Sequence, residues 1–200
     1  MKTGKIVTVS GSGLPKPGDS HYAEARALGA ELATRGFVVC TGGYGGVMEA
    51  ASRGAKEAGG RTIGVTAVVF TTRANKWIDK EVRVKEWGDR LFELVDRGQG
   101  YVVCPGGTGT LVELAVVWEM INKGVMRSKP IVALGQFWAP VVKRVAEMES
   151  SRNGQSRKFS KNRVHFSTSA RDAADYLANF FGAISGQHNS RSRSARKSRR

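Results

Sequence analysis

The feature that most constrains the fold is a glycine-rich turn between a strand and a helix, at Pro105–Glu113. The apolar run Tyr101–Cys104 precedes it and the apolar segment Leu114–Trp118 follows it, a pattern typical of a buried strand and a buried helix. Glycines leave the backbone without Cβ atoms, so its N–H groups can approach an anion at the positive end of the helix. We therefore interpret one segment as a phosphate-binding turn, formed by Gly106, Gly107, Thr108, Gly109 and Thr110.

The same pattern occurs twice more near the N-terminus. The β-rich run Lys5–Ser10 ends at Gly11–Gly13, which makes Gly11 and Ser12 a second ligand-facing turn, and Phe37–Cys40 ends at Thr41–Gly46. Further strands are expected at 61–65, 82–84, 131–134 and 164–167, and helices at 19–35, 47–58, 88–97, 137–148 and 169–181. This alternation predicts an α/β fold with a Rossmann-like, doubly wound, mostly parallel sheet and helices on both faces. The weakly periodic segment 66–80 is a candidate binding loop or lid.

Composition favours one domain followed by a basic tail. The 200 residues, 40% of them hydrophobic, suit a single domain over 1–183. Residues 150–163 shift to Ser, Arg, Lys and Asn and are expected to form a mobile loop, and 184–200 a disordered basic Ser/Arg tail. The net charge is +15, and the last ten residues hold six Lys or Arg and no acid. The basic body suits anionic small molecules, and the tail suits weak, non-specific contact with nucleic acid.

Several classes of protein are disfavoured. Cys40 and Cys104 accompany no Cys-x-x-Cys or Cys/His cluster, which indicates reduced thiols rather than a metal site or disulfide. The first residues lack the apolar segment of a signal peptide and no run reaches membrane-spanning length, so we expect a cytoplasmic protein without membrane contact. No P-loop, complete Gly-x-Gly-x-x-Gly or nucleophile elbow is present. Chemistry would have to use carboxylate, arginine and backbone amides.

Some of these features have purely structural explanations. Thr110-x-x-Glu113 also fits a helix capping box, and the glycines at 42–46 also fit a tight connection between strand and helix. Arg90 is either a surface cation or a fixed guanidinium that pairs with phosphate or with Glu113. Glu49 and Arg53 fit an ordinary helix pair.

The helix after Glu113 is apolar on nearly all sides. A helix of this kind must be buried on several sides. A chain of this size offers limited room for that, which predicts a homodimer interface.

Gly42–Ala55 and Pro105–Glu113, with Arg90 between them, closely resemble the Lonely Guy (LOG) family, over roughly residues 5–145. The resemblance implies a Rossmann-like homodimer that hydrolyses the N-glycosidic bond of nucleoside 5′-monophosphates. The substrates would be cytokinin riboside monophosphates or AMP, and no metal or organic cofactor is expected. Related branches bind nucleotide-like ligands without known turnover, molybdenum-cofactor carriers among them. A non-enzymatic carrier on the same fold is therefore the alternative.

The resemblance also implies roles for individual residues. Arg90 and Glu113 match the catalytic pair. The phosphate turn matches at Gly106, Gly107, Gly109 and Thr110, and the other nucleotide-facing loop matches at Gly43, Gly45, Gly46, Met48 and Glu49. The chain departs from the pattern of cytokinin-activating members at Asp89, Leu91 and Val112, and at Tyr44, where a glycine is common. The identity of the base therefore stays open.

Overall fold

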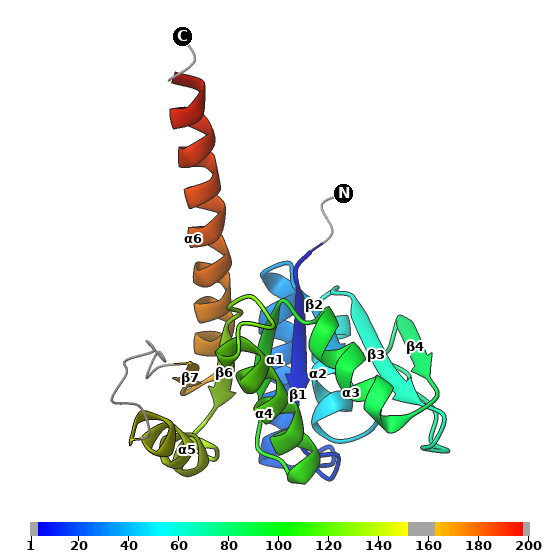
Figure 1. The fold of residues 1–200 in the computed structure, drawn as a ribbon. Helices are drawn as coiled ribbons and strands as arrows, with labels where there is room; N and C mark the ends of the chain where they lie inside the picture. Colours follow the sequence, from blue (N-terminus) through cyan, green and yellow to red (C-terminus); the bar gives the residue numbers. More distant parts are fainter. Residues whose placement is uncertain (1–3, 152–162, 198–200) are drawn as a thin grey trace.

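The computed structural model describes residues 4–151 and 163–197. Its seven strands are separated by helices, except that β4 follows β3 directly. The strands are β1 (Ile6–Ser10), β2 (Val38–Thr41), β3 (Thr62–Ala67), β4 (Lys80–Val84), β5 (Gly100–Val103), β6 (Ile131–Leu134) and β7 (Val164–Ser167). The helices are α1 (Ser20–Thr34), α2 (Val47–Glu57), α3 (Trp87–Arg97), α4 (Thr108–Asn122), α5 (Ala139–Ser151) and α6 (Ala170–Lys197). Figure 1 shows their arrangement around the sheet.

The strands lie in the order β4-β3-β2-β1-β5-β6-β7, and every neighbouring pair is parallel. β1 is central, and its Thr8 lies opposite Cys40 of β2 on one side and Tyr101 of β5 on the other. The chain first winds from β1 toward β4 and then returns to add β5, so the winding direction reverses between β1 and β5. The predicted Rossmann-like, doubly wound fold is confirmed, and the described sheet is parallel throughout.

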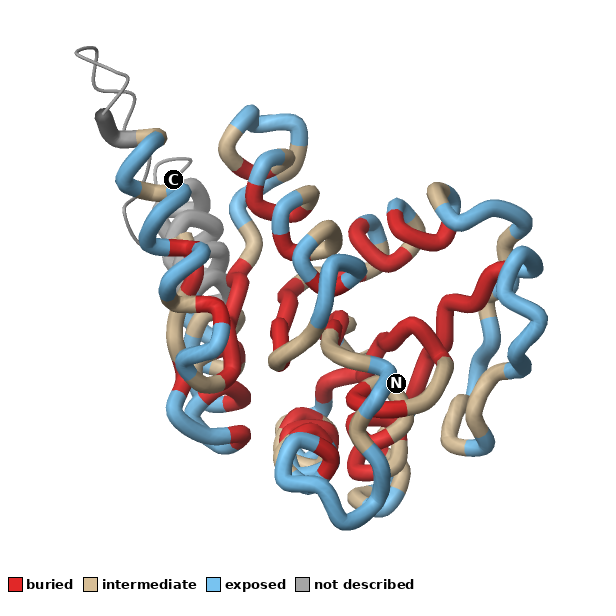
Figure 2. Tube along the Cα trace, turned by 90° about the horizontal axis from the view of Figure 1, so that it is seen from below, coloured by how far each residue is buried: buried red, intermediate tan, exposed pale blue. Residues whose placement is uncertain are grey.

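Helices cover both faces of the sheet. On one face, α1, α2 and α6 pack around Val7, Val9 and Val39, and on the other α3, α4 and α5 pack around Tyr101 and Val103. Because alternate side chains of a strand point to opposite faces, strands buried on both faces need apolar residues at nearly every position. Figure 2 shows buried residues along the strands and on the helix sides that face them.

Helices α1 and α2 approach each other so closely that glycine is required where they cross. A Cβ on Gly54 would lie 1.8 Å from the carbonyl oxygen of Arg26. We expect Gly54→Ala to lower the free energy of unfolding by about 2 kcal/mol, because forcing packed helices apart outweighs the gain in helix propensity. Urea unfolding followed by circular dichroism measures the change. Gly88→Ala is the control, since a Cβ there meets no heavy atom within 4 Å, and an equal loss in both variants would contradict the explanation.

The C-terminal helix reaches into the segment predicted to be a tail. Helix α6 ends at Lys197, and a disordered tail over 184–200 stays a prediction. Residues 187–197 contain no Gly or Pro, which is compatible with a helix because a helix satisfies its backbone groups internally. In Figure 1 this end of α6 extends away from the body, opposite to the carboxyl ends of the strands. The predicted mobile loop at 150–163 falls mainly on 152–162, outside the described residues.

Across the described part of the chain, no helix combines the length and the apolar character needed to cross a membrane.

Candidate active site

Three glycine-rich turns meet at the carboxyl ends of β1, β2 and β5. The Ser12 N–H donates to the Pro105 carbonyl at 3.0 Å, and the Ser12 carbonyl accepts from the Val47 N–H at 2.8 Å. Gly46 permits this approach, because a Cβ there would lie 2.3 Å from the Ser12 carbonyl oxygen. The turn after β1 thus joins the other two at the point where the winding reverses, which is where open α/β sheets bind ligands.

A cavity of about 560 Å³ opens at this junction, within the size range of small-molecule sites. Its walls come from the turns after β1 and β2, the segment after β3, and the first turns of α3 and α4. The lining residues are Val9, Ser10, Gly11, Ser12, Gly13, Leu14, Gly42, Tyr44, Met48, Phe70, Thr72, Trp87, Arg90, Gly107, Thr108, Gly109, Thr110 and Glu113. A shallower hollow of about 430 Å³ adjoins it and shares Ser12, Leu14 and Gly107.

The first turn of α4 presents backbone N–H groups at this cavity. The first bond within the helix runs from the Leu111 N–H to the Gly107 carbonyl at 3.0 Å, so the N–H groups at 108–110 precede it and can bind an anion. Gly107 is the N-cap and no side chain caps it. Thr110 is therefore the third residue of the helix rather than its cap. The capping box is wrong as an explanation of Thr110 and Glu113.

Arg90 is held by backbone carbonyl groups of β3 and of the turn directly after β2. Its Nε donates to the Val65 carbonyl at 2.9 Å and its Nη2 to the Gly42 carbonyl at 3.2 Å. The residue is only 9% exposed, so the interpretation as a surface cation is wrong. The remaining nitrogen, Nη1, lies 3.9 Å from Oε1 of Glu113. Arg90 thus directs a buried charge and one set of donors at the carboxylate, because carbonyl groups hold the rest of the guanidinium.

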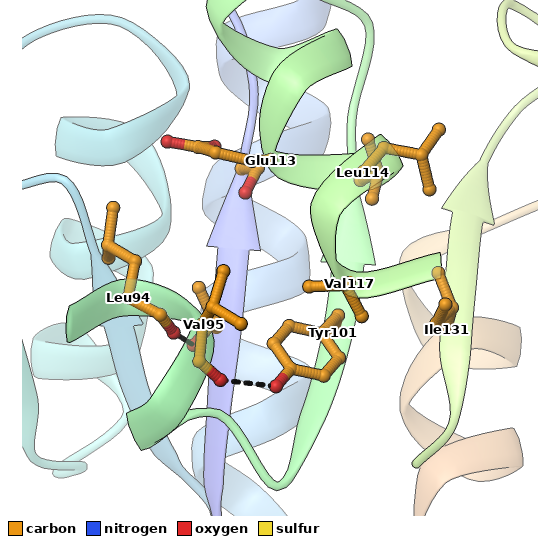
Figure 3. A pocket seen from close by; sticks show the side chains of 10 residues that line it. Leu94, Val95, Tyr101, Glu113, Leu114, Val117 and Ile131 are labelled. Atoms are coloured by element: carbon orange, nitrogen blue, oxygen red, sulfur yellow. Dashed lines mark hydrogen bonds between the residues drawn. The ribbon is translucent and has the colours of Figure 1, made fainter. Parts of the chain in front are cut away.

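Glu113 lies between the large cavity and an apolar interior. Figure 3 shows this interior, where Leu94, Val95, Tyr101 and Val117 surround a space behind the carboxylate. That space measures only about 10 Å³, no more than one water molecule occupies. It cannot hold a ligand, but it places hydrocarbon against the inner side of Glu113.

The surroundings of Glu113 act on its charge in opposite directions. Burial is the largest effect and raises the pKa of the Glu113 carboxyl above its usual value, whereas the Ser10 hydroxyl and the Arg90 charge lower it. The net shift is upward, so the ionised carboxylate is poorly solvated. A poorly solvated carboxylate is a stronger base, and it stabilises a positive charge better than one in water.

Most residues predicted from the sequence come together here. Those that line the cavity are Gly11, Ser12, Met48, Arg90, Gly107, Thr108, Gly109, Thr110 and Glu113. Gly106 lies in the adjoining hollow, where a Cβ would come within 2.3 Å of Thr110 Oγ1. Gly43, Gly45, Gly46 and Glu49 lie outside the lining. Of these, Glu49 accepts a hydrogen bond from the Tyr22 hydroxyl at 3.3 Å, and Gly43 has a positive φ of 77°.

The structure adds an aromatic wall that sequence patterns did not reveal. Tyr44, Phe70 and Trp87 line the cavity together with Leu14 and Thr72. The sequence marked 66–80 as a binding loop but gave no signal for which of its residues face inward. Flat aromatic surfaces next to the free N–H groups of a helix start are suited to a planar ring that carries an anionic group. Within the described ranges, no set of three or more His, Cys, Asp or Glu side chains is placed to hold a metal ion.

Comparison with known proteins finds relatives named as enzymes of nucleotide 5′-monophosphates and a similar solved structure of a molybdenum cofactor binding protein. The cytokinin riboside 5′-monophosphate phosphoribohydrolase of Mycobacterium marinum is 37% identical over 113 residues, which are 55% of this chain and 60% of the relative. The pyrimidine/purine nucleotide 5′-monophosphate nucleosidase of Escherichia coli K12 is 30% identical over 105 residues, 48% of this chain and 23% of the relative. Among solved structures, the molybdenum cofactor binding protein of Rippkaea orientalis has a TM-score of 0.72 and 26% identity, over 90% of this chain and 99% of that one.

The chain spans about 60% of the length of the mycobacterial relatives that it matches. The family match is longer and covers residues 4–166. It includes all three glycine-rich turns as well as Arg90 and Glu113, the features on which the LOG resemblance rests. The chain therefore belongs to the SLOG cluster4 family, a LOG-like family.

Proposed function

We propose that the protein hydrolyses the N-glycosidic bond of a nucleoside 5′-monophosphate, either a cytokinin riboside monophosphate or AMP. Water adds to C1′ of the ribose, the bond from C1′ to the base nitrogen breaks, and the base and ribose 5-phosphate are released. One observation carries the proposal. A mostly buried carboxylate and a fixed guanidinium share a cavity with the N–H groups at the start of a helix.

The geometry suggests a role for each part of the site. The 5′-phosphate binds the N–H groups at 108–110, and Glu113, one turn further along α4, lies next to the ribose. Glu113 stabilises the positive charge that develops at C1′, or it activates the attacking water. Arg90 orients Glu113 through Nη1. Glycosidases usually employ two carboxylates, but Glu113 is the sole carboxylate among the described residues that line this cavity.

The comparisons support two candidate functions. Hydrolysis agrees with the names of the M. marinum and E. coli relatives, which act on nucleotide 5′-monophosphates. A non-enzymatic carrier of a nucleotide or of molybdenum cofactor agrees with the R. orientalis structure, which matches 90% of the chain. Both would use the phosphate turn. Only hydrolysis gives a reason for a desolvated carboxylate facing the cavity.

Incubation with a panel of nucleoside 5′-monophosphates and the matching nucleosides distinguishes the two. We expect free base from at least one monophosphate and none from its nucleoside, because the phosphate positions the ribose. Chromatography detects the base, and a phosphate-sugar assay detects ribose 5-phosphate. Tight binding of nucleotides without release of base from any of them would favour the carrier.

We also propose that the protein works as a homodimer. The surface formed by α4 and α5 leaves apolar side chains exposed, among them Leu111, Val141, Val145 and Met148, and a groove of about 210 Å³ runs between the two helices. A second copy would cover these side chains. Light scattering at micromolar concentration should return twice the mass of the chain, and a clean monomer would contradict the proposal.

A cytoplasmic location and weak contact of the basic C-terminal segment with nucleic acid stay predictions.

A further inference from the structure

We propose that Tyr44 is a positioning residue, whose ring keeps the Arg90 guanidinium directed at Glu113 through a cation–π contact. The consequence for turnover rests on the function proposed above. The contacts that support the positioning itself involve only the protein and can be tested without substrate.

The Tyr44 side chain is anchored at the carboxyl end of β3. The last pair between β2 and β3 joins Thr41 to Gly64, but β3 continues to Ala67. Past this pair, the Tyr44 hydroxyl accepts from the Ala67 N–H at 2.9 Å and donates to the Ala67 carbonyl at 3.3 Å. One hydroxyl therefore satisfies backbone groups that β2 no longer reaches, and the two bonds fix the position of the ring.

The anchored ring lies over Arg90. The centroid of the Tyr44 ring is 5.3 Å from Cζ of Arg90, and that of Phe70 is 5.9 Å away. The two rings contact each other edge to face, with centroids 5.8 Å apart. The two distances from Cζ of Arg90 to the ring centroids are within the range of cation–π attraction, which is strongest where water is excluded. Carbonyl groups accept from Nε and Nη2, and Cζ lies over the two aromatic rings, which leaves Nη1 for Glu113.

The backbone of Tyr44 is also held. The Asn75 side-chain amide donates to the Tyr44 carbonyl at 2.8 Å and to the Gly43 carbonyl at 3.1 Å. Asn75 belongs to the same segment as Phe70, between β3 and β4. Tyr44 therefore connects this segment, which forms one wall of the cavity, to the arginine next to the carboxylate.

Hydrogen exchange at the Arg90 Nε–H tests the positioning directly. This N–H group donates to the buried Val65 carbonyl, so its proton should exchange slowly with solvent in the full chain without ligand. We expect Tyr44→Leu, which removes the ring, to speed the exchange roughly 10-fold or more, because the guanidinium can then tilt away from the carbonyl groups. Tyr44→Phe keeps the ring but loses the two bonds of the hydroxyl, so its exchange rate should lie between those of the native chain and Tyr44→Leu. NMR of arginine-labelled protein measures the rate, and Arg90→Lys assigns the signal.

The same variants give a kinetic readout. We expect kcat of Tyr44→Leu to fall roughly 10-fold to 100-fold, since a catalytic group is misplaced, with a much smaller change in KM and with part of the rate restored in Tyr44→Phe. Should Tyr44→Leu fail to fold, Tyr44→Met provides an apolar side chain of similar volume that is unbranched and adapts better to an irregular space. Unchanged Nε–H exchange in the folded variant would overturn the proposal. Faster exchange in Tyr44→Leu, together with a native chain that releases base from none of the nucleotides, would uphold the positioning and refute the hydrolase function.

Discussion

Glu113→Gln is expected to reduce the release of base by about 1,000-fold while nucleotide binding is kept. The amide fills the same space in the cavity wall but carries no charge, so it can neither stabilise a cationic sugar nor take a proton from water. The phosphate contacts proposed at the start of α4 should be unaffected, because they would come from backbone N–H groups. Chromatography measures the release of base, and calorimetric titration with AMP measures binding.

Glu119→Gln is the matched control. Glu119 lies on the same helix but is exposed, and its carboxylate pairs with Lys123 at 3.5 Å on the surface. Removing a pair of this kind changes stability little and should leave turnover unchanged. Equal activity of native protein and Glu113→Gln would refute the catalytic role of Glu113, whereas loss of AMP binding would show that the carboxylate serves binding instead.

The raised pKa of Glu113 makes the same substitution informative about stability. A carboxyl whose pKa is higher in the folded state than in the unfolded state stabilises the fold at low pH, and this contribution is lost as the pH rises through the folded-state pKa. At neutral pH the ionised Glu113 therefore destabilises the fold. We expect Glu113→Gln to unfold in urea at pH 7 with a free energy equal to or above that of the native chain. Activity needs the ionised form of Glu113. When the pH is lowered, activity should therefore begin to fall at a higher pH than it would with an exposed Glu of ordinary pKa.

The second large effect is expected from Gly42→Ala, with a fall in turnover of about 100-fold. A Cβ on Gly42 would lie 1.8 Å from Nη2 of Arg90 and 2.7 Å from Sδ of Met48. Both atoms are at the far ends of flexible side chains, so these side chains move and the backbone stays in place. The guanidinium then loses its bond to the Gly42 carbonyl, and Nη1 shifts away from Glu113. Steady-state kinetics measures the loss, and urea unfolding should show a loss of stability of about 1–3 kcal/mol, because a buried charged donor loses its acceptor.

Gly88→Ala controls for the substitution itself. Gly88 lies two residues before Arg90 on α3, and a Cβ there meets no heavy atom within 4 Å. This variant should keep full activity and be at least as stable as the native chain, since alanine favours the helix. Full activity in Gly42→Ala would show that the position of Arg90 does not limit turnover.

The sequence was a reliable guide wherever a property depends on neighbouring residues. Alternation of apolar runs with glycine turns located the strands and most helices within a few residues, because periodicity and turn chemistry are local. It could not distinguish a cavity-facing glycine such as Gly107 from Gly43 or Gly46, since both kinds satisfy the same demand for a tight turn.

The sequence by itself determined the parallel α/β fold, the phosphate turn at 106–110 and the pairing of Arg90 with Glu113 as candidates. Only the tertiary structure decided what these two residues experience. It placed Thr110 inside α4 and so excluded a capping role for Glu113, and it buried Arg90 between two carbonyl groups more than twenty residues distant in the chain. The aromatic wall and the raised pKa of Glu113 also arise from segments far apart in the sequence. Burial, desolvation and the direction of a side chain depend on these distant neighbours, which local patterns do not encode.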